Sequence, residues 1–165
     1  MRGKDLSANQ PREEAMQSNL YETDFYAWTL EQSKLLKEGD FKQLDIINLV
    51  EEVESLGKQQ RQELRNRLGV LIGHLLKWDY QSEKRSKSWR VTIREQRREI
   101  LRLLQENPSL KPYLEEAILY AYESGLDLVA RETPLDYPDL PESCLYTSEQ
   151  LFDPEFPSNL NEPQE

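Results

Sequence analysis

The stretch that decides the fold is LRNRLGVLIGHLLKW, residues 64–78. Its large apolar side chains recur at steps of four, three, four and three, at Leu64, Leu68, Leu71, Leu75 and Trp78. Side chains at this spacing lie on one face of an α-helix, because each helical turn brings the next one into the same row. The stretch therefore predicts an amphipathic helix whose apolar face is buried.

Residues before this stretch predict two further helical segments. An apolar stripe steps by three, four and three, at Ile46, Leu49, Val53 and Leu56, after the candidate N-cap Asp45. This stripe is out of phase with the first across Gly57, so we predict one long helix that is kinked or interrupted near that glycine. An earlier helix begins at the candidate N-cap Thr23 and ends at Gly39, since glycine suits the residue after a helix.

Residues after the stretch predict two more helices. Ser86 and Ser88 are alternative N-caps of a basic helix over residues 88–106, which ends before Pro108 because the residue preceding a proline avoids helical backbone angles. Ser109 is the candidate N-cap of the next helix. No segment alternates as a strand does, so the sequence predicts an all-α bundle of about four main helices.

The C-terminal part predicts a strap that packs on this bundle. Six of the nine prolines fall in residues 133–165, yet large apolar residues recur among them, which is not typical of a solvated tail. Thr147 and Gln150 have the spacing of a capping box, which predicts one short helix within the strap. We predict a flexible N-terminal tail over residues 1–19, a single helical domain over residues 20–157 that includes the strap 133–157, and a disordered tail over residues 158–165.

Composition places the chain among intracellular globular proteins. Its 165 residues suit one domain, and no apolar run approaches the roughly 18 residues that a membrane helix needs. The N-terminus lacks the apolar region of a signal peptide, and one cysteine, Cys144, cannot form an internal disulfide. We therefore expect a cytoplasmic protein with no membrane partner.

Charge is spread unevenly along the chain, whose net charge is −10. Residues 1–57 are net −6, residues 58–102 are net +8 and residues 103–165 are net −12. One interpretation, which we favour, is that basic and acidic helices neutralise each other. The other is a basic face that binds an acidic partner. The overall negative charge makes nucleic acid the less favoured partner, since phosphate binding needs a positive surface.

Five short segments occur in an order that resembles a known family. They are His74–Trp78, Ser86–Trp89 leading into Ile93–Arg98, Pro108–Leu110, Cys144–Tyr146 and Gln150–Asp153. Together they resemble the cyanobacteria-rich family catalogued as domain of unknown function twenty-nine, over about residues 20–157. The resemblance implies an all-α fold and no activity, so no functional residue is carried over. Leu145 departs from the proline expected after the cysteine.

No arrangement of residues predicts catalysis or metal binding. The most suggestive pairing is His74 with the carboxylates of Glu51, Glu52 and Glu54, but a di-metal carboxylate bundle needs two Glu-x-x-His elements, and this chain has one histidine and no such element. We expect His74 to be a partly buried histidine with a satisfied hydrogen bond. Cys144 has acidic neighbours and no glycine-rich elbow, which disfavours a nucleophile. We therefore predict no catalytic residue, no metal site and no cofactor.

The basic helix 88–106 carries the candidate interaction surface. Arginines on adjoining helical rows, close to two tryptophans, suit anion or nucleic-acid recognition. The alternative, which we favour, is that the tryptophans are core residues and the arginines pair with acidic helices or the acidic strap. The candidate residues are Trp78, Trp89, Arg90, Arg94, Arg97 and Arg98.

The most favoured function is that of a non-catalytic helical interaction or regulatory protein. Its partner would be a protein, either a second copy of the chain or a different one, because long helices with apolar seams serve interfaces as well as cores. One alternative is a nucleic-acid- or anion-binding module that uses helix 88–106. The other alternative is an enzyme of unidentified chemistry.

Overall fold

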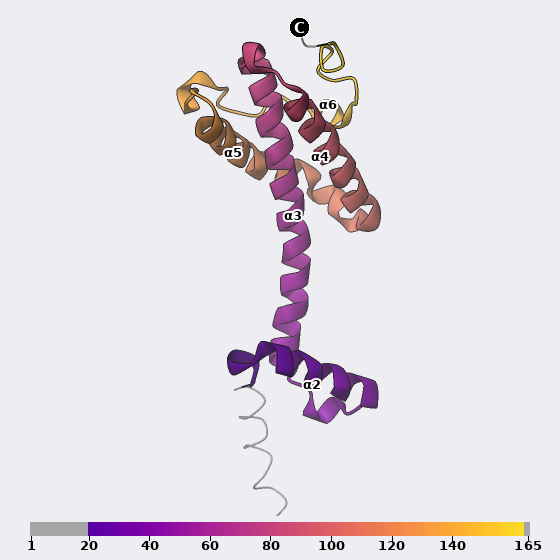
Figure 1. Ribbon diagram of the computed structural model, residues 1–165. Coiled ribbons are helices and arrows are strands. Elements are labelled where there is room, and N and C mark those ends of the chain that lie inside the picture. Colours follow the sequence, from indigo (N-terminus) through magenta and orange to yellow (C-terminus); the bar gives the residue numbers. More distant parts are fainter. Residues whose placement is uncertain (1–19, 164–165) are drawn as a thin grey trace, which may run out of the picture. The chain divides into compact units, whose positions relative to one another are not determined.

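The computed structural model describes residues 20–163, and every regular element in this part of the chain is helical (Figure 1). The all-α prediction is thus confirmed. The predicted flexible tail 1–19 lies outside the described residues, as do residues 164–165 of the predicted C-terminal tail. Between residues 20 and 163, no helix has the length and apolarity that crossing a membrane requires.

The chain divides into two compact units, with the boundary after Lys58. Unit 1 comprises the described residues 20–58, and unit 2 comprises residues 59–163. The long helix α3, Ile46–Tyr80, supplies its first turns to unit 1 and the remainder to unit 2. The prediction that residues 20–157 form a single domain stays a prediction.

Polar contacts join the helices of unit 1. Helix α2, Phe25–Glu38, and the 3₁₀ turn η1, Phe41–Gln43, precede α3. The indole Nε1 of Trp28 donates to Oδ2 of Asp45 at 3.0 Å, and the backbone N of Asp45 donates to Oε1 of Gln32 at 2.8 Å. These bonds join the buried face of α2 to the start of α3. Asp24 caps α2 in place of the predicted Thr23, while Gly39 ends α2 with a left-handed φ of 72°, as predicted.

Helix α3 runs through Gly57 as one helix, so the interruption, one of the two predicted alternatives, does not occur. A glycine inside a helix is less favourable than alanine by only about 1 kcal/mol. The residues around Gly57 are mostly good helix formers, so the sum over several turns still favours the helix. The side of Gly57 where a Cβ would lie is open, with no heavy atom within 4 Å.

Unit 2 packs three helices around the predicted seam. Helices α4, Lys87–Glu106, and α5, Leu114–Glu132, lie beside the C-terminal part of α3 (Figure 1). Every member of the seam is fully buried, at Leu64, Leu68, Leu71, Leu75 and Trp78. Isoleucines of α4 and alanines of α5 pack against them in one continuous core. Burying each large apolar side chain contributes roughly 1.5–3 kcal/mol, so this seam is the main stabilising element.

Local capping residues set the ends of α4 and of the connection to α5. Ser86 is the N-cap of α4, and its hydroxyl accepts from the backbone N of Trp89 at 3.3 Å. After the 3₁₀ turn η2, Ser82–Lys84, this cap fixes where α4 begins. Ser109 was predicted to be an N-cap, but it is not one. It lies in the 3₁₀ helix η3, Pro108–Tyr113, whose N-cap is Asn107, and α5 begins at Leu114. An α-helix that began at Pro108 would need the N–H of residue 112, which Pro112 lacks.

Helices α3 and α5 approach each other at glycines. A Cβ added to Gly73 would lie 3.2 Å from the carbonyl oxygen of Gly125 and 3.2 Å from Cβ of Leu128. A Cβ added to Gly125 would lie 3.2 Å from the backbone N of Gly73. These contacts involve backbone and Cβ atoms, which rotation of a side chain does not move. The absence of a side chain at Gly73 and Gly125 therefore sets the spacing of the two helices.

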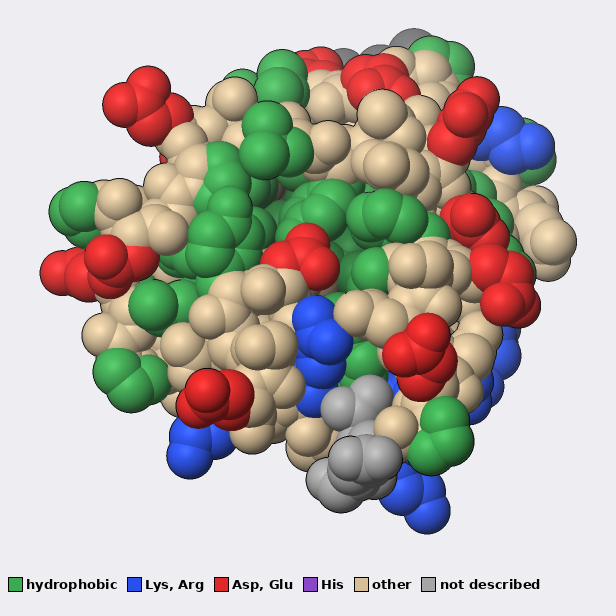
Figure 2. Space-filling view, turned by 90° about the horizontal axis from the view of Figure 1, so that it is seen from above, with side chains coloured by type: hydrophobic (Ala, Val, Ile, Leu, Met, Phe, Trp, Pro, Cys, Tyr) green, Lys and Arg blue, Asp and Glu red, His purple; other side chains and the backbone are tan. Residues whose placement is uncertain are grey.

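The strap packs on unit 2 as predicted. It contains the 3₁₀ turn η4, Tyr137–Asp139, and the short helix α6, Ser148–Phe152, which begins with the predicted capping box of Thr147 and Gln150. Leu140 and Leu151 are buried in the core of unit 2, and the hydroxyl of Tyr146 donates to Oδ2 of Asp79 at 2.6 Å. On the face shown in Figure 2, acidic side chains stand dispersed around a central group of hydrophobic ones.

Residues 158–163 differ from the disorder predicted for residues 158–165. They form turns, and Leu160 is fully buried in the core cluster of unit 2. Oδ1 of Asn159 accepts from the indole Nε1 of Trp78 at 2.8 Å. One apolar side chain and one amide thus hold a polar segment, and composition alone gives no sign of such a contact.

The glycine contact between α3 and α5 generates a stability prediction. We expect Gly73→Ala to lower the free energy of unfolding by about 1–3 kcal/mol, because the added methyl group must displace backbone and Cβ atoms. Urea denaturation measures this difference. Gly57→Ala is the matched control and should raise stability by up to about 1 kcal/mol, since its methyl group meets nothing. Equal effects of the two changes would contradict a tight contact.

Candidate functional site

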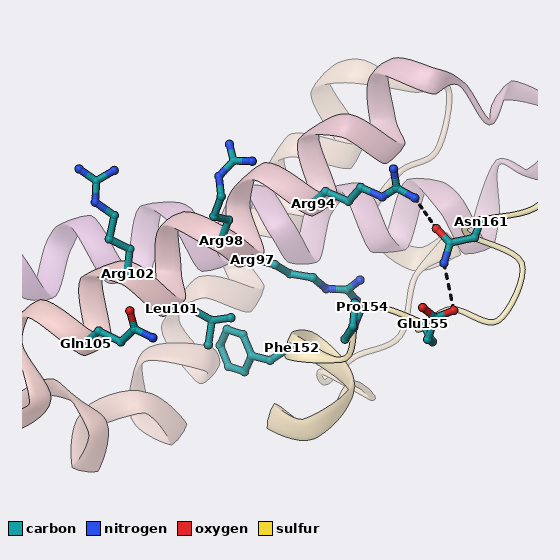
Figure 3. A pocket seen from close by; sticks show the side chains of 10 residues that line it. All are labelled: Arg94, Arg97, Arg98, Leu101, Arg102, Gln105, Phe152, Pro154, Glu155 and Asn161. Carbon is teal, nitrogen blue, oxygen red and sulfur yellow. Dashed lines mark hydrogen bonds between the residues drawn. The ribbon is translucent and has the colours of Figure 1, made fainter.

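One face of α4 lines a pocket of about 610 Å³ in unit 2. Arg94, Arg98, Leu101 and Gln105 recur at steps of four, three and four, so they share one face of the helix. The opposite wall comes from the strap and the residues after it. Figure 3 shows the complete lining, which comprises Arg94, Arg97, Arg98, Leu101, Arg102, Gln105, Phe152, Pro154, Glu155 and Asn161.

Arg97 is the buried member of this lining and fastens the strap. Its Nε donates to the carbonyl oxygen of Leu151 at 2.7 Å. Its Nη2 donates to the carbonyl oxygens of Gln150 at 3.2 Å and Phe156 at 2.7 Å. Hydrogen bonds from a charged donor are stronger than neutral ones, so a single guanidinium holds both ends of this part of the strap.

Arg97 keeps one donor without a protein acceptor. Its Nη1 is buried and has no hydrogen-bond partner among the described residues, although the residue is only 5% exposed. Burial lowers the pKa of Arg97 to about 10, partly offset by the charge of Asp153. The guanidinium is therefore still a cation at neutral pH. A buried cationic N–H without an acceptor favours a ligand that accepts hydrogen bonds.

A chain of polar contacts forms one end of the pocket. Nη2 of Arg94 donates to Oδ1 of Asn161, and Nδ2 of Asn161 donates to Oε2 of Glu155 at 3.1 Å (Figure 3). Arg94 is thus held by a neutral amide, and the carboxylate of Glu155 is occupied by that amide. At the other side, Leu101 of α4 faces Phe152 of α6 (Figure 3). The pocket therefore has a cationic wall next to an apolar one.

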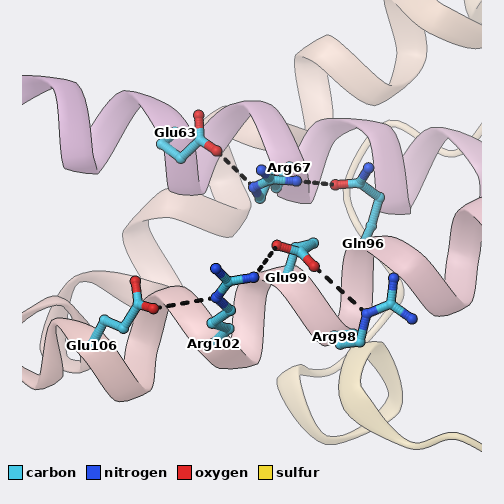
Figure 4. A network of polar contacts seen from close by, with 7 residues as sticks. All are labelled: Glu63, Arg67, Gln96, Arg98, Glu99, Arg102 and Glu106. Carbon is cyan, nitrogen blue, oxygen red and sulfur yellow. Dashed lines mark hydrogen bonds and ion pairs between the residues drawn. The ribbon is translucent and has the colours of Figure 1, made fainter.

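Arg98 and Arg102 share a carboxylate of their own helix. Oε1 of Glu99 lies 3.5 Å from Nε of Arg98, and Oε2 of Glu99 lies 3.6 Å from Nη1 of Arg102. Arg102 also contacts Glu106 at 3.2 Å (Figure 4). These distances exceed the roughly 2.7–2.9 Å of a short charge-assisted bond, and exposed pairs contribute only about 0–1 kcal/mol. Both arginines can exchange these partners for a bound anion at little cost.

The favoured prediction was that the arginines pair with acidic helices or with the acidic strap, and the contacts follow it only in kind: the arginines have structural partners, but the strap offers them carbonyl oxygens and not carboxylates. The strap meets Arg97 through carbonyl oxygens and Arg94 through an amide, while Arg98 and Arg102 meet glutamates of α4 itself. The one arginine that contacts a different helix in Figure 4 is Arg67 of α3, which binds Glu63 at 2.7 Å and Gln96 of α4 at 3.4 Å. Four arginines against one glutamate line a pocket in a chain of net charge −10.

Three of the six predicted surface residues lie outside this pocket. Trp78 is fully buried, and Trp89 packs against the core with Nζ of Lys77 4.5 Å from the centre of its ring. Nη1 of Arg90 donates to the backbone oxygen of Glu162 at 3.5 Å. The alternative that we favoured for the tryptophans, a place in the core, agrees with these positions. The pocket brings together the other three predicted residues, Arg94, Arg97 and Arg98.

The lining residues outside the predicted candidate set come mostly from the C-terminal segment, and Arg102 lies one turn beyond the candidate arginines of α4. Arg102 follows Arg98 at a step of four, which is a signal that the sequence contains. Phe152, Glu155 and Asn161 lie more than fifty residues beyond Arg98, and no periodic pattern connects them to α4. Only the docking of the strap places them at the pocket.

His74 and Cys144, the residues weighed for chemistry, occupy structural positions. Nδ1 of His74 lies 2.9 Å from the carbonyl oxygen of Val70, which is the satisfied hydrogen bond expected for it. Sγ of Cys144 donates to the carbonyl oxygen of Tyr146 at 3.7 Å, and burial raises the pKa of this thiol. Within residues 20–163, no three His, Cys, Asp or Glu side chains group as metal ligands would.

These features define an all-α protein with an arginine-lined pocket closed on one side by a C-terminal strap. The chain belongs to the family described as Domain of unknown function DUF29, whose model matches residues 20–157. The resemblance stated from the five sequence segments is therefore confirmed. No curated protein and no solved structure matches the chain.

The buried guanidinium generates a prediction about the strap. We expect Arg97→Ala to lower the free energy of unfolding by about 2–4 kcal/mol, because three carbonyl oxygens lose a charged donor. Limited proteolysis should then cut within residues 133–157 at a much higher rate. Arg98→Ala, an exposed neighbour on the same helix, is the control and should change stability by at most about 1 kcal/mol. Unchanged proteolysis in Arg97→Ala would show that the strap is held by other contacts.

His74 generates a prediction about pH. Burial lowers the pKa of His74 below its ordinary value of 6.5. The hydrogen bond to Val70 and the charge of Glu132 oppose this shift, and the charge of Lys77 adds to it. As the pH falls through 6.5, the unfolded chain binds a proton that the folded chain still resists, so the free energy of unfolding must fall. We expect this loss between about pH 7.0 and pH 5.5, where histidine is the side chain that ordinarily titrates.

Urea denaturation at the two pH values measures the loss. His74→Gln should remove most of the difference, because the chain has no second histidine. A variant that still loses the same stability between these pH values would show that another group is responsible.

Proposed function

We propose that this chain is a non-catalytic helical interaction protein, and that its pocket binds an acidic segment of a partner protein. The single observation that carries the proposal is the set of four arginines that line the pocket, of which Arg97 keeps a buried N–H without a protein acceptor. Guanidinium groups bind carboxylates through two parallel hydrogen bonds, which gives both affinity and geometry.

The neighbourhood of the arginines favours a peptide as the ligand. Leu101, Phe152 and Pro154 form apolar surface beside the cationic donors, so the pocket suits a carboxylate next to a large apolar side chain. Its volume of about 610 Å³ falls within the range of roughly 300–1,000 Å³ typical of ligand pockets. A segment of a few residues with alternating acidic and apolar character matches both properties.

Nucleic acid and enzymatic chemistry receive less support. The chain is net −10, and a nucleic acid carries a charge at every nucleotide and extends beyond the pocket, so it would be repelled more than a short acidic segment that ends within the pocket. Trp78, which would be needed for base stacking, is buried. A protonated Cys144 and a helix-bound His74 disfavour nucleophilic catalysis. We also propose that the chain acts in the cytoplasm, an expectation that rests on the sequence.

Fluorescence anisotropy with labelled peptides tests the proposal. The probes are a peptide of alternating glutamate and phenylalanine, a peptide of alternating glutamate and serine, and a single-stranded RNA of the same charge. We expect the full chain to bind the first probe at least about tenfold more tightly than the other two, because only that probe fills both walls of the pocket.

The variant for this test is Arg98→Gln with Arg102→Gln, which removes two exposed charges and leaves the strap anchor Arg97 in place. Binding of the first probe should weaken about tenfold or more, since each lost charge-assisted bond contributes about 1.5–3 kcal/mol when desolvated. The matched control is Lys84→Gln with Lys87→Gln, two exposed lysines outside the pocket lining. Preference for RNA, or equal loss in the control, would overturn the proposal.

A further inference from the structure

The wall that α4 gives to the pocket changes in character along the helix. The end nearer the start of α4 holds three arginines, Arg94, Arg97 and Arg98. The middle holds the apolar Leu101, and the other end holds the amide of Gln105. A rise of 1.5 Å per residue spreads these side chains over roughly 16 Å of the helix axis. The wall therefore presents, in order, positive charge, apolar surface and a neutral amide.

Two arginines at the first end form no ion pair within the described residues. Arg94 donates to the amide of Asn161, and Arg97 donates to three backbone carbonyl oxygens. Both partners are neutral, so they satisfy hydrogen bonds without cancelling charge. Arg102, near the other end, already pairs with two glutamates of α4. An anionic ligand therefore gains most at the first end, where the cations have no carboxylate of their own.

The same end of the pocket is closed by a row of side chains. Nη2 of Arg94 donates to Oδ1 of Asn161, whose Nδ2 donates to Oε2 of Glu155 (Figure 3). A peptide that runs along α4 toward this row meets these side chains and a second carboxylate ahead of it. A ligand whose chain stops there, with its negative charge at the end, fits this arrangement better than a segment whose chain has to continue.

The middle of the pocket suits one large apolar side chain. Leu101 is 43% exposed, and it faces Phe152 of α6 (Figure 3). Arg98 precedes Leu101 by three residues and is therefore its neighbour on the helix surface. In Figure 3 the guanidinium of Arg98 is turned away from Phe152. Its side chain is 70% exposed and lies 3.5 Å from the adjacent Glu99, so rotation of an exposed side chain brings it to a bound anion.

We propose that the pocket binds the C-terminal residue of a partner protein, through a free α-carboxylate and a large apolar side chain. This inference rests on the proposed function and names the part of the partner that binds. The last residue of a chain carries both groups on one α-carbon, which is the closest pairing of the two that a polypeptide offers. Capture of a C-terminal carboxylate is a recurring mode of peptide recognition.

Each part of the wall has a role in this complex. The α-carboxylate lies at Arg94 and Arg98, where two guanidinium groups donate to it. The apolar side chain lies between Leu101 and Phe152. The amide of Gln105 is exposed and both donates to and accepts from the preceding peptide group, so the partner chain leaves the pocket along the later turns of α4.

Fluorescence anisotropy of the full chain with three labelled peptides tests the proposal. Each peptide has about six residues and ends in phenylalanine after a run of glycine and serine. The first has a free α-carboxylate, and the second ends in an amide. The third also ends in an amide but has glutamate before the phenylalanine, which restores the net charge. We expect the first to bind at least about tenfold more tightly than either amide, because it alone places its charge at the end of the chain.

Substitutions at one arginine test where the α-carboxylate lies. Arg98→Gln should weaken binding of the first peptide about tenfold and change binding of the two amides by at most about twofold. Arg98→Lys should restore only part of the affinity, because an ammonium group cannot donate two parallel hydrogen bonds to a carboxylate. The matched control is Lys87→Gln, an exposed lysine of α4 outside the pocket lining, which should leave all three affinities unchanged.

The outcomes separate this inference from the proposed function. Equal affinities for the free carboxylate and the two amides would refute recognition of a chain end. The proposed function would still stand if an amidated peptide of alternating glutamate and phenylalanine bound and lost affinity in Arg98→Gln with Arg102→Gln. An internal acidic segment would then be the ligand. No binding of any of these peptides would overturn both.

Discussion

The close approach of α3 and α5 is the constraint on which the rest of unit 2 depends. Gly73 and Gly125 let the two backbones meet where any side chain would hold them apart. At this spacing the apolar seam of α3 is covered by α5 on one side and remains available to α4 on the other. The position of α4 in turn determines where its row of arginines lies, so a feature without side chains fixes the location of the pocket.

The second determining contact is electrostatic. Arg97 is almost fully buried, and burying a guanidinium is unfavourable unless its N–H groups find acceptors. The strap supplies them, which explains how a Pro-rich segment with few regular hydrogen bonds of its own takes one defined path. The acceptors do not saturate the guanidinium, because Nη1 remains without a partner among the described residues. The contact that closes one wall of the pocket therefore also leaves a donor for a ligand.

Much of this fold could be predicted from the sequence, because its strongest signals are local. The seam from Leu64 to Trp78 follows the helical period, and the caps at Ser86 and Thr147 are short-range patterns. The sequence did not decide whether α3 continues through Gly57. The outcome depends on whether the helix propensities of the neighbouring residues together outweigh the unfavourable propensity of this one glycine. The site was predictable only in part. Arginines on one helix face are visible in the sequence. The wall containing Phe152 depends on the packing of the strap against α4, and no periodic pattern in the sequence indicates that contact.

The way in which the strap is attached has a consequence for how this family can diversify. Arg97 holds the strap through backbone carbonyl oxygens, and every amino acid, proline included, provides one. Substitutions among the exposed strap residues can therefore change the chemistry of the pocket wall without releasing the strap from α4. Attachment to α4 depends on the backbone of the strap, whereas the chemistry of the pocket wall depends on its side chains. A relative with a different residue in place of Phe152 or Glu155 would keep the architecture while presenting a different pocket wall.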